Sequence, residues 1–266
     1  MIKVGISSAC LYPMLTEDAV KFLVDNGVKH TEIFFNSFSE LSSGFIGELR
    51  RVLIPAGVAV EAIHPFSCVA EPLFLFSSYK RRFEDSLDQY RRYFEAAQLL
   101  KCHKFVLHGD RADRHSIDEK EYFERYARLC EIGKAYGVSV LQENVSNFRS
   151  RSVEFIKNMS EYLGDGVEFT FDVKQCIRAG VDPFEMFDAM GRKIRHVHLS
   201  DNDGARDCLV AGQGSFDVSA LFDRLYSIDY DGAVLLEVYR HNFKEEKELL
   251  EGLNFIKQFV KSEEII

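Results

Sequence analysis

Eight short apolar runs alternate with longer amphipathic segments along the chain, and this alternation strongly limits the possible fold. Short apolar runs bounded by turn-forming residues are typical of buried strands, whereas the segments between them have the period of helices. We predict strands at Lys3–Ser8, His30–Phe35, Val58–Pro65, Lys104–Gly109, Ser139–Val145, Glu168–Lys174, Ile194–Ser200 and Ala233–Tyr239. Regular alternation of strands and helices indicates a parallel α/β sheet, and eight strands predict a closed (β/α)8 TIM barrel.

The segments between the strands carry clear helical signals. One apolar face contains Phe83, Leu87, Tyr90, Phe94 and Ala97, which should pack on the barrel wall. The sequence Asp182-Pro183-Phe184-Glu185 combines a capping residue, a proline and an acid, all favourable at a helix start, and predicts that the sixth helix begins there. The apolar positions from Leu249 to Val260 predict a last helix.

The length and composition favour one domain. The chain has 266 residues, and barrels of this type commonly contain about 250 residues. No linker, low-complexity segment or shift in composition divides the sequence, so we predict a single barrel domain over residues 1–266.

The charge and the cysteines restrict the partners and the cell compartment. A net charge of −9 opposes binding to a nucleic-acid backbone. The first apolar run is too short to span a membrane and opens directly into a strand pattern, so we expect no membrane partner and a cytoplasmic location. Six cysteines without a CxxC spacing agree with reduced thiols.

Four residues near the carboxyl ends of predicted strands form the main candidate site. They are Glu143, Asp172, His198 and Glu237. A (β/α)8 barrel gathers its site residues at these ends, and three converging carboxylates repel one another unless a cation holds them. Oxygen ligands with one nitrogen predict one divalent metal ion, Mn²⁺, Mg²⁺, Co²⁺ or Zn²⁺. The alternative is that the acids form structural ion pairs with Lys174, Arg206 or Lys193.

Further polar residues lie at comparable positions. His64 and His108 end their strands, where they can donate to a substrate, bind a second metal or serve as core histidines. His196 lies deeper than His198 and is expected to orient or pack. Lys174 shares the predicted strand face of Asp172. Arg206, in the long polar loop after the seventh predicted strand, is a candidate for binding a sugar hydroxyl or phosphate, although this loop also has the composition of a solvated turn.

The ordered strings IHPF, LHGD, ENV, FDVKQ, HVHLSDNDG and LLEVY resemble the xylose isomerase-like barrel superfamily. That superfamily contains sugar phosphate isomerases and epimerases and the endonuclease IV type of AP endonuclease. The resemblance implies that Glu143, Asp172, His198 and Glu237 bind the metal. It also implies that Glu143 and Glu237 are catalytic and exchange protons with a sugar or sugar phosphate through an enediolate. We expect His64, His108, Lys174, Gln175 and Arg206 to bind the substrate.

Three departures from the family pattern keep other functions open. Gln175 stands where many relatives have a histidine, Asp207-Cys208-Leu209 lacks the histidine of the endonuclease branch, and Lys174 places an ammonium beside the predicted metal. A one-metal site is therefore favoured over a three-metal cluster. A metal-dependent sugar isomerase or epimerase is the leading hypothesis, and the alternatives are an inosose dehydratase-type lyase, an AP endonuclease and a non-catalytic sugar-binding barrel. The sequence indicates neither the particular sugar nor the oligomeric state.

Overall fold

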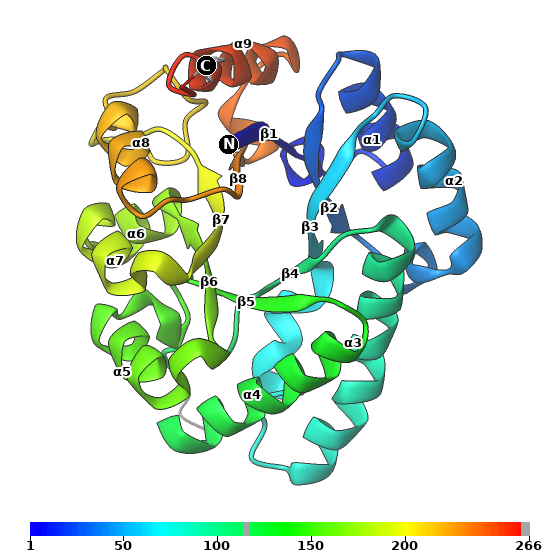
Figure 1. Cartoon of the computed structure of the whole chain (residues 1–266), viewed down its shortest axis with the longest axis vertical. Coiled ribbons are helices and arrows are strands. Elements are labelled where there is room, and N and C mark those ends of the chain that lie inside the picture. The colour runs from blue at the N-terminus through cyan, green and yellow to red at the C-terminus, as the bar shows by residue number, and fades with distance from the viewer. Residues whose placement is uncertain (114–116, 262–266) are drawn as a thin grey trace.

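Eight parallel strands close into a barrel in the computed structural model, which describes residues 1–113 and 117–261 (Figure 1). The strands are β1 (Lys3–Ser7), β2 (His30–Phe35), β3 (Ala59–Pro65), β4 (Lys104–Leu107), β5 (Ser139–Glu143), β6 (Glu168–Asp172), β7 (Ile194–Leu199) and β8 (Ala233–Leu236). Each strand pairs with its neighbours in sequence order, and β1 closes the barrel against β8. The predicted (β/α)8 fold is confirmed.

Helices surround this barrel (Figure 1). They are α1 (Thr16–Asp25), α2 (Ser43–Leu53), α3 (Lys80–Leu100), α4 (Glu119–Ala135), α5 (Val153–Leu163), α6 (Val173–Ala179), α7 (Pro183–Met190), α8 (Val218–Ser227) and α9 (Lys247–Lys257). The predicted apolar face of α3 is buried, and the rings of Tyr90 and Phe94 lie 5.6 and 5.4 Å from Phe105 of β4. Aromatic packing of this kind fixes α3 to the barrel wall.

The predicted helix start at Asp182 is confirmed, but it opens the seventh helix. The Asp182 carboxylate accepts hydrogen bonds from the backbone N–H groups of Phe184 and Glu185, at 2.7 and 3.1 Å, which caps α7. The short helix α6 precedes it. The last helix, α9, overlaps the predicted segment Leu249–Val260, but it begins two residues earlier, at Lys247, and ends at Lys257.

Six strands end one to three residues before their predicted ends because the chain turns out of the sheet at its carboxyl edge. At β6, one oxygen of Asp172 accepts a hydrogen bond from the backbone N–H of Gln175 at 3.0 Å and caps α6. Lys174 therefore lies in the first turn of α6, and the prediction that it continues strand β6 is wrong. Side-chain capping of a helix overrides the apolar pattern at this point.

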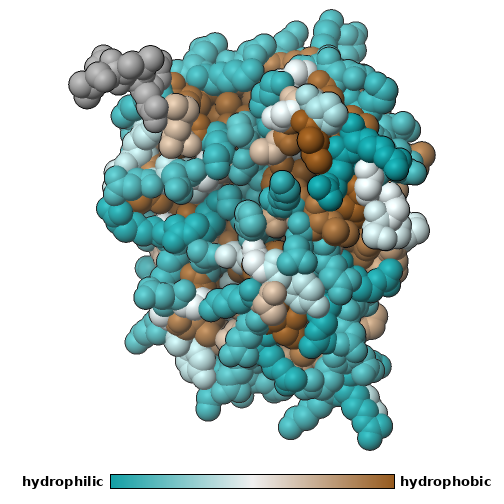
Figure 2. Space-filling model, turned by 45° about the vertical axis from the view of Figure 1, so that its right-hand side comes forward, coloured by the Kyte–Doolittle hydropathy of each residue, from teal (hydrophilic) through white to brown (hydrophobic). Residues whose placement is uncertain are grey.

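The remaining bulk features agree with a packed globular chain. All six cysteines are buried and free of disulfide bonds. Among the residues that the structure describes, no helix combines the length and hydrophobicity needed to cross a membrane. The face seen in Figure 2 is mainly hydrophilic, with smaller hydrophobic areas between the charged side chains.

Candidate active site

The carboxyl edge of the barrel brings together Glu143, Asp172, His198 and Glu237. Glu143 and Asp172 are the last residues of β5 and β6, His198 lies in β7, and Glu237 follows β8 directly. The Nδ1 atom of His198 lies 3.1 Å from Glu143 Oε1, 3.3 Å from Glu237 Oε2 and 3.6 Å from Asp172 Oδ2. All four residues are buried. The convergence expected from the strand ends is therefore present.

A fifth acid, Glu32 of β2, lies behind His198 and was missed in the sequence analysis. Its Oε2 accepts hydrogen bonds from Nε2 of His198 at 3.0 Å and from Nε2 of His196 at 3.1 Å, while Ser7 Oγ donates to Oε1 at 3.0 Å. Glu32 is fully buried. It lies inside the apolar run HTEIFF, so the argument that singled out the other acids also applied to it. The structure supports the expected orienting or packing role of His196.

The charges in this cluster shift the pKa values of its members. Burial alone lowers the pKa of His198, but the charges of Glu237 and Glu32 and hydrogen bonds to Asp172 and Glu143 raise it well above the usual value. Burial alone raises the pKa of Glu32, but the imidazoles of His198 and His196 hold it well below the usual range. The pKa values of Glu143 and Glu237 are also lowered despite burial, chiefly by the charges of His108 and His198, whereas burial raises the pKa of Asp172. The cluster therefore favours ionised glutamates around a cation.

Lys174 supplies such a cation from within the chain. Its Nζ contacts Asp172 Oδ2 and Glu237 Oε2, and its side chain is 3% exposed. Burial lowers the pKa of Lys174, but the charges of Asp172, Glu237 and Glu143 raise it well above the usual value. Lys174 therefore forms the structural ion pairs with the acids that were the alternative to a metal site. Arg206 pairs instead with Asp203, and Lys193 donates to backbone carbonyl groups.

His64 and His108 lie on the other side of Glu143. The two Nε2 atoms are 3.1 Å apart, and Glu143 Oε2 lies 2.9 Å from Nε2 of His108 and 3.8 Å from Nε2 of His64. Cys68 adds a thiol near the two histidines, with ligand atoms within 4.8 Å of one another. Both histidines therefore face the site, at positions suited either to a substrate or to a second cation.

A cavity of about 410 Å³ opens onto this cluster. Its volume falls within the range of small-molecule sites. It is lined by Ala9, Tyr12, Phe34, Asn36, His64, Phe66, Cys68, His108, Glu143, Lys174, Gln175, Glu237 and Tyr239. Aromatic side chains and polar groups thus share the lining. The side-chain oxygen of Gln175 already has a partner, because Oε1 accepts a hydrogen bond from the backbone N–H of Ser146 at 3.0 Å.

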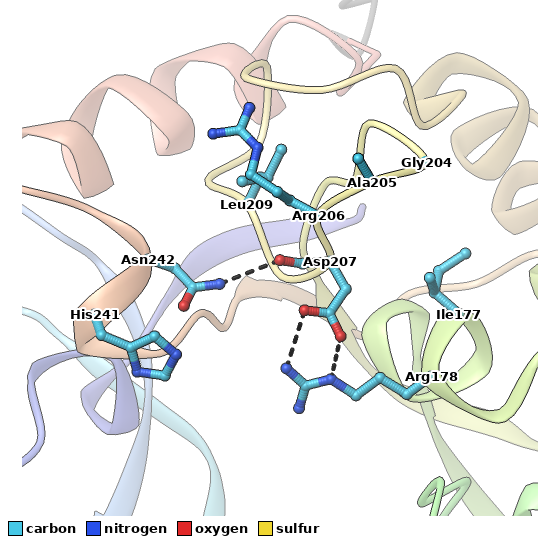
Figure 3. Close-up of a pocket in the computed structure, with 9 residues that line it drawn as sticks. All are labelled: Ile177, Arg178, Gly204, Ala205, Arg206, Asp207, Leu209, His241 and Asn242. Atoms are coloured by element: carbon cyan, nitrogen blue, oxygen red, sulfur yellow. Dashed lines mark hydrogen bonds and ion pairs between the residues drawn. The ribbon is translucent and has the colours of Figure 1, made fainter.

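Arg206 lines a different cavity, of about 630 Å³, together with Arg178 and Asp207 (Figure 3). Arg178 forms a two-pronged ion pair with Asp207 and donates to the hydroxyl of Tyr239 at 2.9 Å. Tyr239 also lines the first cavity, so the two cavities are neighbours. The structure does not bring Arg206 to the four-residue cluster, because the geometry of a long loop is not set by strand periodicity.

The closed parallel barrel, with a polar cluster at its carboxyl edge, defines a TIM-barrel protein. The model of the xylose isomerase-like TIM barrel family matches residues 20–259. The chain belongs to this family.

Individual proteins are similar to the chain over nearly its whole length. An uncharacterized protein of Mycobacterium leprae is 26% identical over 291 residues, covering 98% of each chain. A D-tagatose 3-epimerase-like protein has a TM-score of 0.80 at 22% identity, covering 97% of each chain. D-psicose 3-epimerase from Clostridium cellulolyticum has a TM-score of 0.78 at 16% identity, covering 98% of this chain and all of that chain.

A further solved structure, described as the IOLI protein with a binding zinc atom, has a TM-score of 0.74 at 17% identity and covers 97% of this chain and 96% of that one. At these identities the similarity shows a shared fold.

The donor set of this chain suits a divalent ion. One atom from each of the four residues lies within 4.8 Å of the others, and hard carboxylate oxygens with one imidazole nitrogen are ordinary ligands of Mn²⁺, Mg²⁺, Co²⁺ and Zn²⁺. Glu32 holds Nε2 of His198 and turns Nδ1 toward the acids, as carboxylates commonly do behind ligand histidines. The residues therefore fit a metal, and Lys174 is the group that departs from such a site.

Proposed function

We propose that the protein is a divalent-metal-dependent isomerase or epimerase of a small sugar or sugar phosphate. The observation that carries this proposal is the convergence of three carboxylates on Nδ1 of His198, with Glu32 fixing the imidazole from behind. Glu143, Asp172, His198 and Glu237 would hold the ion. The sugar epimerases among the proteins of the same fold support this reaction class.

The chemistry follows from the positions of the two glutamates. A bound divalent ion polarises a ketose carbonyl and stabilises negative charge on its oxygen. Glu143 and Glu237 both line the cavity, from the ends of β5 and β8, so they reach a substrate from different strands. One glutamate takes the proton beside the carbonyl. Proton return from the other glutamate to the opposite face inverts the carbon, whereas return to the neighbouring carbon isomerises the sugar.

The remaining lining residues suit the binding of a sugar. His64, His108 and Gln175 offer hydrogen-bonding groups for hydroxyls, while Tyr12 and Phe66 offer aromatic surface for the carbon face. A small substrate also agrees with the net charge of −9, which opposes a nucleic-acid partner. We therefore place the substrate between the aromatic side chains and Glu143.

Two measurements test the proposal. Elemental mass spectrometry of protein purified without chelator should find about one Mn, Co, Mg or Zn per chain. Ketoses and their phosphates incubated with this protein in heavy water should exchange a carbon-bound proton, and Glu143→Gln should abolish that exchange while the fold is kept. Exchange that persists in Glu143→Gln, or in protein stripped of metal, would contradict the mechanism.

A non-catalytic sugar-binding barrel is the second candidate, and the contacts of Lys174 favour it. The ammonium already neutralises Asp172 and Glu237, so these acids need no metal to coexist. This candidate predicts sugar binding that survives a chelator, with no proton exchange. Calorimetric titration of ketoses with and without chelator, combined with the exchange assay, separates the two candidates. The metal-dependent enzyme shows exchange that chelator abolishes, whereas the binding barrel binds sugar in chelator and shows no exchange.

A further inference from the structure

We propose that Lys174 is a built-in competitor of the metal, an ammonium that neutralises two of the metal-binding acids until an ion displaces it. The inference rests on the proposed function, because it assumes that the four-residue cluster binds a divalent ion. It adds a role for a residue that takes no part in the proposed proton transfer. Metal binding to this chain then requires the side chain of Lys174 to move.

The oxygen atoms that Lys174 contacts carry the argument. They are Asp172 Oδ2 and Glu237 Oε2. The same two atoms face His198 Nδ1, at 3.6 and 3.3 Å, and Asp172 and Glu237 belong to the group of residues able to share an ion. Lys174 therefore contacts carboxylate oxygens that point into the candidate metal site and not a separate pair of acceptors.

The position of Lys174 in the chain stabilises its contacts with Asp172 and Glu237. Asp172 caps α6 with its Oδ1, and Lys174 lies two residues further on, in the first turn of that helix. One carboxylate thus starts the helix with one oxygen and binds the ammonium with the other. The buried ammonium has little water to replace these contacts, so it leaves the acids only when another cation takes its place.

An ion and an ammonium on the same two oxygens repel each other strongly. Two like charges a few ångströms apart in a buried site interact by several kcal/mol even at a moderate effective dielectric constant. The ammonium must therefore move away for the ion to bind, and the cost of breaking its two contacts weakens metal binding. Removing the ammonium should remove that cost.

The test compares Mn²⁺ binding to the full-length chain and its variants by isothermal titration calorimetry after dialysis against chelator. Lys174→Met removes the ammonium and keeps a long side chain, and Lys174→Gln is a second neutral variant in case the first folds poorly. Arg178→Met is the matched control, because Arg178 lies one turn further along α6 and contacts Asp207 and Tyr239, not Asp172 or Glu237.

We expect each neutral Lys174 variant to bind Mn²⁺ at least roughly tenfold more tightly than the unchanged chain, and Arg178→Met to bind within about threefold of it. The metal-free Lys174 variants should also melt at a lower temperature than the unchanged chain, a difference that saturating Mn²⁺ should abolish. Binding only by the Lys174 variants would support the inference and contradict a metal-dependent function of the unchanged chain.

Two results would overturn the inference. Equal or weaker Mn²⁺ binding by the Lys174 variants would show that the ammonium does not compete, while leaving the proposed function intact. No Mn²⁺ binding by any protein in the series would overturn both. If Arg178→Met gained as much Mn²⁺ affinity as the Lys174 variants, the gain would come from the loss of any positive charge on α6. That result would also refute direct competition by Lys174.

Discussion

Replacing Glu32 by glutamine tests how the candidate site is held in place. Glutamine keeps the shape of Glu32 and one accepting oxygen, but it removes the negative charge that receives hydrogen bonds from His196 and His198. A hydrogen bond to a charged group contributes about 1.5–3 kcal/mol, against about 0.5–1.5 kcal/mol for a neutral one. With two such bonds weakened, the free energy of unfolding should fall by about 2 kcal/mol.

The same change should lower the affinity of the candidate site for a divalent ion. His198 would lose the carboxylate that directs its Nδ1 toward Glu143 and Glu237, and loss of such a partner typically lowers metal affinity by about 10- to 100-fold. Urea unfolding followed by circular dichroism, in chelator, measures the stability, and calorimetric titration with Mn²⁺ measures the affinity.

The matched control for Glu32→Gln is Glu61→Gln. Glu61 of β3 is also a buried acid paired with a histidine, His30, at 2.8 Å, but it has no contact with the candidate site. Glu61→Gln should lower the stability and leave Mn²⁺ affinity unchanged. The reasoning is refuted if Glu32→Gln changes stability by less than about 0.5 kcal/mol or binds Mn²⁺ as tightly as the unchanged chain.

Three further predictions follow from the described contacts. Burial raises the pKa of Glu61, but the hydrogen bond from His30 and the charges of Lys104 and Lys3 lower it from 4.5 to about 2. At about 1.4 kcal/mol per pKa unit, this shift corresponds to a stabilisation of at most about 3.5 kcal/mol, which solvent screening reduces. The stabilisation is present above pH 4.5 and is lost as the pH falls toward 2. Acid unfolding curves of the unchanged chain and Glu61→Gln should therefore converge near pH 2, and parallel curves would contradict this. Glu237→Gln should weaken Mn²⁺ binding and abolish proton exchange with an intact far-ultraviolet spectrum, and a fully active variant would exclude Glu237 from the mechanism. His198→Ala should lower Mn²⁺ affinity at least roughly tenfold, whereas His64→Ala should mainly raise the substrate concentration needed for half-maximal exchange; equal metal loss in both would make His64 a ligand.

The barrel and most of the site could be predicted because both depend on strand ends. Parallel strands in a closed barrel present their carboxyl ends at one edge, so an acid or histidine at each end must approach the others. Glu143, Asp172 and His198 follow this rule. Glu32 also follows a sequence rule, since it is a charged residue within the apolar run HTEIFF, although it lies in the middle of that run and not at its carboxyl end.

The parts that could not be predicted depend on where the chain leaves the sheet. The contacts of Lys174 follow from the start of α6 at Val173, which the capping by Asp172 sets and the apolar pattern does not reveal. Arg206 depends on the path of the loop after β7, where its partner is Asp203. Loop paths are set by local turns and tertiary contacts, so residue type alone does not place their side chains.

The hydrogen bond between Glu32 and His196 has a consequence for the synthesis of the chain. It joins residues 164 positions apart, so Glu32 leaves the ribosome long before its imidazole partners exist. At about 5–20 residues per second, this charged residue of β2 spends about 8 to 33 seconds without them. The nascent chain has neither the complete four-residue cluster nor a closed barrel until β8 and Glu237 are added, so the candidate site exists only in the finished barrel.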